Sequence, residues 1–133
     1  MSVRISSKYI GDGQVELIHE SSGKSLVTDL PVDNGGKGRT FSPADLLAAS
    51  LSSCILTIMA KMAERDGLEL RGAELVIEKE MSADPRRVGS LKGAVRLPAG
   101  IPDASRRKLL NAVAACPVHR SLHPEVRVEI RGS

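Results

Sequence analysis

The two cysteines of the chain, Cys54 and Cys116, are the residues whose type and spacing point most directly to chemistry. Cys54 lies within a long apolar run, residues 43–65, that has the pattern of a helix, whereas Cys116 lies in the segment Ala-Ala-Cys-Pro-Val-His. Two cysteines far apart in sequence, each inside an expected ordered element, suggest a redox pair. The alternative is that both are small buried apolar residues, because free cysteine is among the most buried residue types.

Thiol chemistry needs a thiolate, and the helix that carries Cys54 offers no local charge to stabilise one. Cys54 lies eleven residues after Pro43, and the helix dipole acts only within the first turn. A cation must therefore come from another segment. Arg39, in the loop that precedes the helix, is the nearest candidate, and Lys37 is the second. The alternative for Arg39 is an arginine on the surface of that loop.

Cys116, by contrast, has a local source of stabilisation. Pro117 can begin a short helix that runs through Leu122, which would make Cys116 its N-cap residue. The local sequence therefore predicts a lowered pKa for the Cys116 thiol. His119 lies three residues later and could face the same side of this turn, the alternative being an exposed or backbone-bonded histidine.

Two other kinds of site are disfavoured. Cys54, Cys116, His119 and His123 could supply four zinc ligands, but their spacing matches none of the usual paired motifs, so we expect no metal. Residues 31–41 form a glycine-rich loop that lacks the Lys-Ser/Thr ending of a phosphate-binding loop.

Composition limits the remaining possibilities. The 133 residues suit a single domain, residues 1–133, and 41% apolar with 26% charged residues are ordinary values for a soluble fold. The net charge is +3, with basic and acidic residues interleaved. A nucleic-acid-binding module is suggested only by the basic pI of 9.1, and only Tyr9 and Phe41 could stack on bases. We therefore expect no nucleic-acid partner.

The N-terminus shows no secretory signal, and no apolar run reaches the length of a membrane span without interruption. Residues 43–63 come nearest, but Asp45, Lys61 and several hydroxyl residues interrupt them. A cytoplasmic location without a membrane partner is therefore the expectation. Cytoplasmic thiols are kept mostly reduced, so a disulfide between Cys54 and Cys116 would be transient and catalytic there.

Apolar periodicity and turn signals together predict an α+β domain. The long helix has the clearest start, because Ser42 is its N-cap, Pro43 takes the first position and Asp45 can complete a capping box. This helix is apolar almost all round, which predicts burial in a core or in a subunit interface. The expected elements are a three-stranded meander over residues 3–30, helix 43–65, a hairpin of 72–82 with 88–97, helix 103–115 and strand 126–131.

Two segments carry a family resemblance. Residues 42–54, Ser-Pro-Ala-Asp-Leu-Leu-Ala-Ala-Ser-Leu-Ser-Ser-Cys, resemble the central-helix motif of the OsmC/Ohr family. Residues 115–122, Ala-Cys-Pro-Val-His-Arg-Ser-Leu, resemble its second cysteine motif. Element order, chain length and the distance between the cysteines agree as well, and the resemblance covers about residues 5–131.

The resemblance implies an intertwined homodimer of α+β subunits, with antiparallel sheets packed around the long central helix and two active sites at the dimer interface. Family enzymes reduce organic hydroperoxides with two cysteines and with no metal or bound organic cofactor. Cys54 matches the peroxidatic thiol and Cys116 the resolving thiol. In family enzymes an arginine from the loop before the central helix holds the thiolate, and Arg39 is the only arginine in that loop here. We follow the resemblance in assigning attack to Cys54, because a specific ion pair in a dry pocket can outweigh a single helix end.

One position departs from the family pattern. In the best-known peroxidases a glutamate directly after the helix-start proline orients the arginine, but here Ala44 stands at that place and the acid follows one residue later, as Asp45. One helical step is a rotation of about 100°, so Asp45 need not face the same side. Asp45 is thus either a site residue, at the place where a less characterised OsmC-like branch carries its acid, or a capping-box acid.

The expected function is that of a thiol-dependent organic hydroperoxide reductase, an antioxidant enzyme of oxidative-stress defence. A sulfenic acid on Cys54 would condense with Cys116, and a dithiol reductant, either a small molecule or a protein-bound lipoyl type, would reduce the resulting disulfide. The rival hypothesis, favoured by the missing glutamate, is a non-catalytic dimeric OsmC-like protein that binds a small apolar ligand. An apolar lining that favours organic peroxides is expected from Leu47, Leu51, Ile55 and Ile58.

Overall fold

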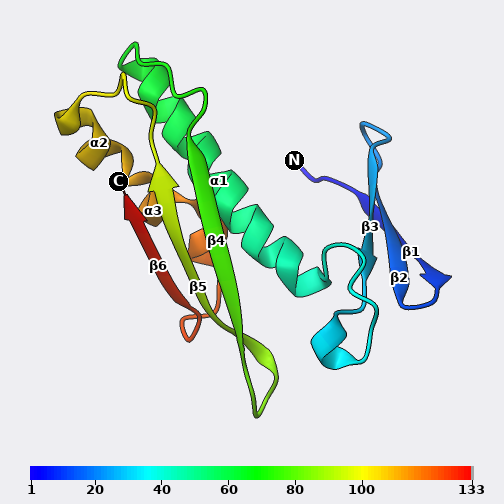
Figure 1. Cartoon of the computed structure of the whole chain (residues 1–133). Coiled ribbons are helices and arrows are strands. Elements are labelled where there is room, and N and C mark those ends of the chain that lie inside the picture. The colour runs from blue at the N-terminus through cyan, green and yellow to red at the C-terminus, as the bar shows by residue number, and fades with distance from the viewer. Residues whose placement is uncertain (133) are drawn as a thin grey trace. The chain divides into compact units, whose positions relative to one another are not determined.

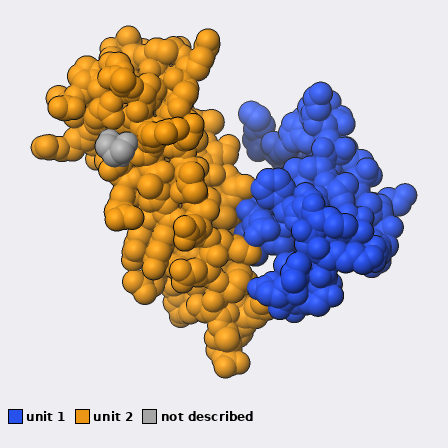
Figure 2. All heavy atoms as spheres, in the orientation of Figure 1, with its two compact units in different colours: residues 1–46 blue, residues 47–133 orange. Residues whose placement is uncertain are grey.

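The computed structural model describes residues 1–132, and its helices and strands fall into two compact units, residues 1–46 and the remainder from Leu47 onward (Figure 2). The first unit holds the strands β1 (Ile5–Gly11), β2 (Gln14–His19) and β3 (Ser25–Asp29). They form an antiparallel sheet in the order β1-β2-β3, as the meander pattern predicted. The chain reverses between β1 and β2 with positive φ at Gly11, Asp12 and Gly13.

The first unit buries no apolar side chain of its own. Its buried residues are Thr28, Asp29 and Ser42, all of them polar. Three-stranded sheets need an apolar face packed against something to be stable, so this sheet requires a partner surface. Its large exposed apolar residues are Met1, Val3, Ile5, Tyr9, Ile10, Leu26, Leu30, Val32 and Phe41.

Helix α1 (Pro43–Arg65) has the bounds that the sequence predicted. The Ser42 backbone N–H donates to Asp45 Oδ2 at 2.9 Å, and the Asp45 N–H donates to Ser42 Oγ at 3.0 Å, which is a complete capping box. At the other end Gly67 adopts φ 68°, and the Leu68 N–H bonds to the Ala63 carbonyl at 2.9 Å. Glycine has no Cβ to oppose this left-handed conformation, so it ends the helix as expected.

The buried side of α1 is a stripe with a spacing of three to four residues. By length and apolar composition, α1 is the one helix in the described part of the chain that could cross a membrane. The core helix of a soluble protein meets the same criteria, and the buried stripe consists of Ala48, Leu51, Ile55, Met59 and Ala63.

The second unit contains the sheet β4 (Glu74–Ser82), β5 (Arg87–Arg96) and β6 (Arg127–Gly132) (Figure 1). Strands β4 and β5 form the predicted antiparallel hairpin, whereas β6 lies parallel to β5. The expected antiparallel pairing thus holds for β4 with β5 but not for β5 with β6. A hairpin reverses direction, but here the chain leaves β5, passes through three short helices and returns in the same direction.

The three helices of this crossover are α2 (Asp103–Leu109), α3 (Ala112–Ala115) and α4 (Pro117–Ser121). The single helix predicted over residues 103–115 is therefore interrupted. The interruption is a tightening of the backbone, because the N–H groups of Asn111 and Val113 each bond to the carbonyl three residues earlier, at 3.0 and 3.2 Å. Pro102, rather than Asp103, occupies the N-cap position of α2.

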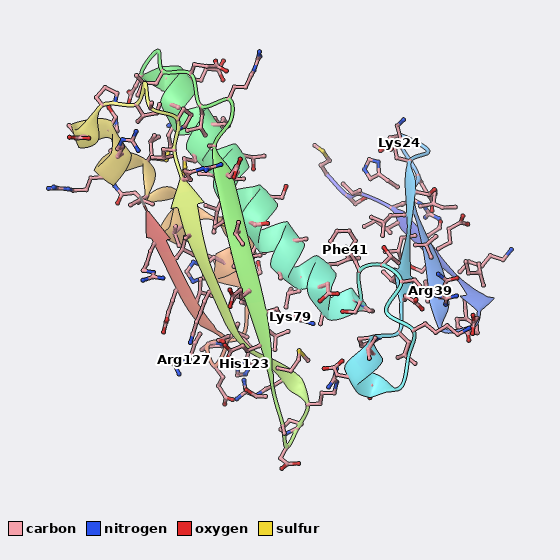
Figure 3. All side chains as sticks on the ribbon, viewed as in Figure 1. Lys24, Arg39, Phe41, Lys79, His123 and Arg127 are labelled. Atoms are coloured by element: carbon pink, nitrogen blue, oxygen red, sulfur yellow. The ribbon has the colours of Figure 1, made fainter. Side chains whose placement is uncertain are left out.

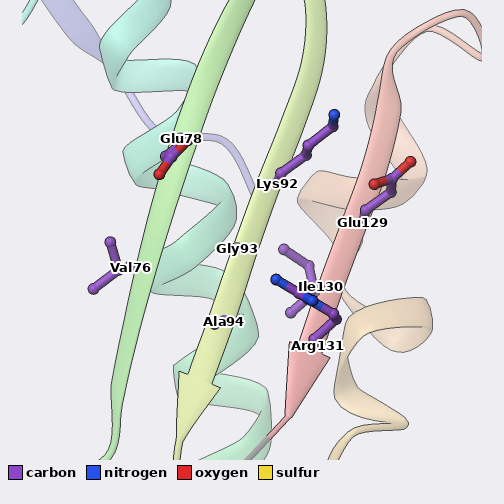
Figure 4. Close-up of a pocket in the computed structure, with 8 residues that line it drawn as sticks. All are labelled: Val76, Glu78, Lys92, Gly93, Ala94, Glu129, Ile130 and Arg131. Atoms are coloured by element: carbon purple, nitrogen blue, oxygen red, sulfur yellow. The ribbon is translucent and has the colours of Figure 1, made fainter.

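The core of the second unit lies between the sheet and its helices, which cover one face of the sheet (Figure 4). Leu91 and Val95 of β5 point into it and are buried. Gly93, between them, has no room for a side chain, since a Cβ would lie 2.8 Å from the Val76 carbonyl oxygen. The largest fully buried side chains that the helices and the N-cap of α4 contribute are Leu51, Ile55, Met59, Leu109 and Cys116.

Candidate functional site

Cys116 occupies the N-cap of α4, as the sequence predicted. Its sulfur accepts a hydrogen bond from the His119 backbone N–H at 3.4 Å, and Pro117 takes the first helical position. The side chain has an exposed fraction of 0%. Cys116 is therefore a capping residue and a core residue at the same time.

The fold brings Cys116 to Cys54. Cys54 lies in the middle of α1 and is half-buried, and its side chain is hydrogen-bonded to that of Cys116. Both thiols are free. Two cysteines that are distant in sequence thus interact directly, which is the arrangement that a redox pair requires.

Burial raises the pKa of the Cys116 thiol, and the hydrogen bond with Cys54 raises it further. Hydrogen bonds from the backbone N–H groups of His119 and Val118 lower this pKa, but the net shift is upward. The prediction of a lowered pKa for the Cys116 thiol is therefore wrong. It rested on the N-cap position alone, and the burial of the thiol could not be known from the local sequence. At neutral pH Cys116 is a protonated thiol that can donate its hydrogen.

The His119 side chain bonds to the backbone, which was the alternative to a ring that faces the same side of the turn as Cys116. Its Nδ1 lies 2.8 Å from the Val113 carbonyl oxygen, so Nδ1 carries the hydrogen and the ring joins α3 to α4. Among residues 1–132 no group of three or more histidine, cysteine, aspartate or glutamate side chains is placed to hold a metal ion.

Arg39 lies in the loop after β3 (Figure 3). Its guanidinium donates hydrogen bonds to two aspartates. Its Nε donates to Asp29 Oδ2 at 2.7 Å, and its Nη2 donates to Asp29 Oδ1 at 3.1 Å. Its Nη1 donates to Asp12 Oδ2 at 3.0 Å, and Nη2 also reaches the Asp12 carbonyl oxygen at 3.0 Å. These bonds use four of the five guanidinium N–H groups and leave one, on Nη1, for a further acceptor.

Sequence reasoning missed Asp29. This residue is 1% exposed, and the Arg39 side chain, followed by the Arg39 backbone N–H, lowers the pKa of its carboxyl to about 2. Hydrogen bonds from Lys37 and then Arg39 also lower the pKa of the exposed Asp12. The available signal was an acid at the end of an apolar strand, at the start of the loop that carries Arg39.

Asp45, the other acid considered for this role, completes the capping box of α1. The carboxylates that bond to Arg39 are those of Asp29 and Asp12. Cys54 and Cys116 pair in the second unit, while Arg39 and Asp45 each have their own partners among residues 1–46.

The second unit also holds an apolar cleft of about 400 Å³, whose lining on α1 lies about two helical turns from Cys54. Leu47 contributes from α1, seven residues before Cys54 and so on the same helical face, while Leu122 contributes from the end of α4. Of the lining expected from the sequence, Leu51 and Ile55 instead lie fully buried in the core. The rest of the cleft is formed by Arg87, Val88, Ser121, His123 and Val126.

A larger hollow, of about 570 Å³, lies on the outer face of the sheet (Figure 4). Ala94 is among its lining residues, and charged side chains of opposite sign lie across the strands, with Lys92 between Glu78 and Glu129. Alternating charges on an open sheet face are the pattern of a solvated surface. The apolar cleft lined by Leu47 and Leu122 is the better candidate for binding an organic molecule.

Residues 36–131 match the family described as OsmC-like protein. A protein of Psychrobacter arcticus 273-4, provisionally named an osmotic stress induced and detoxification response protein, is 37% identical. The similarity covers 97% of this chain and 94% of that one, with a TM-score of 0.92. No curated protein matches the sequence.

Two solved structures are more distant. The organic hydroperoxide resistance protein OsmC of Legionella pneumophila is 20% identical over 100% of this chain and 97% of its own, with a TM-score of 0.78. The organic hydroperoxide resistance protein OhrB of Bacillus subtilis is 16% identical over 100% of this chain and 98% of its own, with a TM-score of 0.73. These two show a shared fold.

Proposed function

Because the chain belongs to the OsmC-like protein family, we propose that it is a thiol-dependent organic hydroperoxide reductase that acts in the cytoplasm. The observation that carries this proposal is the hydrogen-bonded pair of free thiols, Cys54 and Cys116, in a unit that also holds an apolar cleft. Structural relatives named organic hydroperoxide resistance proteins support the same reaction class.

The proposed reaction begins with the more exposed thiol. The Cys54 thiolate attacks one peroxide oxygen, the O–O bond breaks, and the other oxygen leaves as an alcohol after taking a proton. Cys54 is then a sulfenic acid. The Cys116 sulfur attacks the Cys54 sulfur, the S–O bond breaks, and the hydroxyl leaves as water with the Cys116 proton. A dithiol, small or lipoyl-type, returns two electrons by thiol–disulfide exchange.

The assignment of roles follows the contrast between the two thiols. Cys54 is half-buried and can meet a substrate, whereas Cys116 is buried, with a pKa held above its usual value. A protonated resolving thiol that already contacts the attacking sulfur needs little movement to form the disulfide. In this proposal Arg39 holds the Cys54 thiolate and Asp45 holds the start of the helix that displays it.

We also propose that the working form is a homodimer in which residues 1–133 act as one domain. The support is the first unit, which has exposed apolar side chains and no apolar core among residues 1–46. A second copy of the chain would supply the missing surface.

A non-catalytic ligand-binding protein is the second candidate. It is favoured by Ala44 in place of the glutamate of known peroxidases, and by the two carboxylates that already neutralise Arg39. The cleft lined by Leu47 and Leu122 could hold a small apolar ligand without any reaction.

Steady-state turnover of cumene hydroperoxide with dithiothreitol tests the proposal. We expect peroxide consumption that the Cys54→Ser variant loses. A wild-type protein that retains two titratable thiols after one equivalent of peroxide would rule out the reductase and leave the ligand-binding protein.

A further inference from the structure

Asp29 is the only buried carboxylate among residues 1–132. It ends β3 and accepts four hydrogen bonds, one from the Leu30 N–H at 3.0 Å and three from Arg39. A buried carboxylate is costly unless it is paired and hydrogen-bonded, and Asp29 meets both conditions through Arg39.

The geometry between the two residues is specific. Both carboxylate oxygens face the Nε–Nη2 edge of the guanidinium, at 2.7 and 3.1 Å, and the Arg39 backbone N–H adds a third bond at 2.9 Å. This fork leaves the Nη1 end pointing elsewhere, held by Asp12 on its exposed side. A bidentate pair sets the plane of the guanidinium as well as its position.

Backbone hydrogen bonds at Asp29 and Leu30 tie down both ends of the loop that carries Arg39. The Asp29 N–H bonds to the Phe41 carbonyl at 3.0 Å, and the Gly38 N–H bonds to the Leu30 carbonyl at 3.1 Å. Gly36 packs so tightly that a Cβ would lie 2.0 Å from the Leu30 carbonyl oxygen. Asp29 thus fixes both the backbone and the side chain of the arginine.

We propose that Asp29 is a positioning residue that acts through Arg39. It replaces the missing helix-start glutamate, whose place is taken by Ala44, and it presents one Nη1 N–H of Arg39 in a fixed direction. The inference rests on the proposed function, in which Arg39 holds the reactive thiolate.

Asp29 could also act by neutralising the positive charge of Arg39, and this would affect formation of the Cys54 thiolate in the opposite direction. Asp29 and Asp12 together balance the charges of Arg39 and Lys37, whose Nζ lies 2.9 Å from Asp12 Oδ2. If Asp29 mainly weakened the field of Arg39, its removal would make thiolate formation easier. If it positions Arg39, its removal makes thiolate formation harder, so the sign of the effect separates the two roles.

The experiment measures the rate of iodoacetamide modification of Cys54 against pH, resolved by peptide mass spectrometry, in the intact protein. We expect Asp29→Asn and Arg39→Lys each to move the midpoint of this profile to higher pH and to slow modification at pH 7 about tenfold or more. Arg39→Lys keeps the charge but loses the fork. In an Arg39→Met background, Asp29→Asn should have no further effect on the midpoint.

A role for Asp29 in folding alone would lower the melting temperature without moving the midpoint, and that result would overturn the proposal. So would a midpoint that moves to lower pH, or one that moves further in the double variant. Asp12→Asn is the matched control, because Asp12 contacts the same guanidinium from the exposed side, and an equal shift there would also overturn the proposal. If the Asp29→Asn variant does not fold, the Arg39→Lys variant decides, because an unchanged midpoint of its alkylation profile would overturn the proposal. Because alkylation needs no peroxide, the inference can stand even if turnover is absent.

Discussion

Cys116 is subject to two opposing effects at the scale of single residues. The end of α4 offers backbone N–H groups that stabilise a thiolate, while complete burial opposes any charge. Desolvation dominates because N–H bonds to sulfur, such as that of His119 at 3.4 Å, are weak, whereas loss of water affects the whole ion. The half-buried Cys54 and the fully buried Cys116 therefore lie in different environments although their side chains interact.

We predict that one equivalent of an organic hydroperoxide converts Cys54 and Cys116 into an intrachain disulfide. The reason is that the two side chains already interact and the sequence contains no other thiol. Intact mass spectrometry should show the loss of two hydrogens. Cys116→Ser should instead accumulate a sulfenic acid on Cys54 that oxidises further, and Cys54→Ser should consume no peroxide. Two unmodified thiols in the treated wild type would contradict this prediction.

Asp29 leads to a prediction about acid stability. Its pKa is lowered from 3.8 to about 2 in the folded chain, so its contribution to stability is complete above the unfolded pKa and is lost as pH falls through the folded one. We expect the melting temperature of the wild type to fall between about pH 4 and pH 2 partly for this reason. Asp29→Asn should show a lower melting temperature at pH 7 and a smaller decline in that window. Asp103→Asn, an exposed control, should decline as the wild type does.

At the scale of elements, the start of α1 is determined by neighbouring residues. Ser42 and Asp45 satisfy each other's backbone N–H groups, and Ser42 is buried. Because α1 carries both Leu47 of the cleft and Cys54, an error in its start would displace the site.

Ser42→Ala should lower the free energy of unfolding by about 1 kcal/mol, since it removes the acceptor of the Asp45 N–H. Urea denaturation at fixed protein concentration measures this change. Ser50→Ala is the control, because Ser50 is exposed in the same helix and its Oγ only returns a bond to the Leu47 carbonyl at 2.8 Å. We expect that control to stay within about 0.5 kcal/mol of wild type. Equal effects of the two substitutions would mean that the capping box contributes nothing specific.

At the scale of the whole molecule, the distribution of apolar surface is uneven. The exposed large apolar residues are concentrated in residues 1–46, whereas the second unit exposes Val76 alone among residues 47–132. A soluble chain rarely leaves such a surface open, which is the physical argument for a homodimer.

We predict a dimeric mass at micromolar concentration by light scattering. Ile5→Glu should weaken the dimer, because it places a charge on the apolar face of the first sheet, where Ile5 is 65% exposed. Val76→Glu is the matched control, with an exposed fraction of 66% on the charged face of the second sheet, and should leave the mass unchanged. A monomeric wild type, or equal effects of both substitutions, would contradict the prediction.

The sequence by itself determined the features that depend on near neighbours. The bounds of α1, its capping box, the β4–β5 hairpin and the N-cap position of Cys116 all follow from residues at most a few positions apart, and the two cysteine motifs were sufficient to indicate the family. Such features are readable because turn, cap and periodicity energies are local.

Only the tertiary structure decided the features that depend on burial and on long-range pairing. Each of these features depends on segments that are not neighbours in sequence. They are the contact of Cys54 with Cys116, the raised pKa of Cys116, the parallel pairing of β6 with β5 and the ion pair of Asp29 with Arg39. The physical reason is that desolvation and ion pairing depend on which surfaces exclude water together. A single sequence pattern states which residues are apolar or charged, but not which of them lose their water against one another.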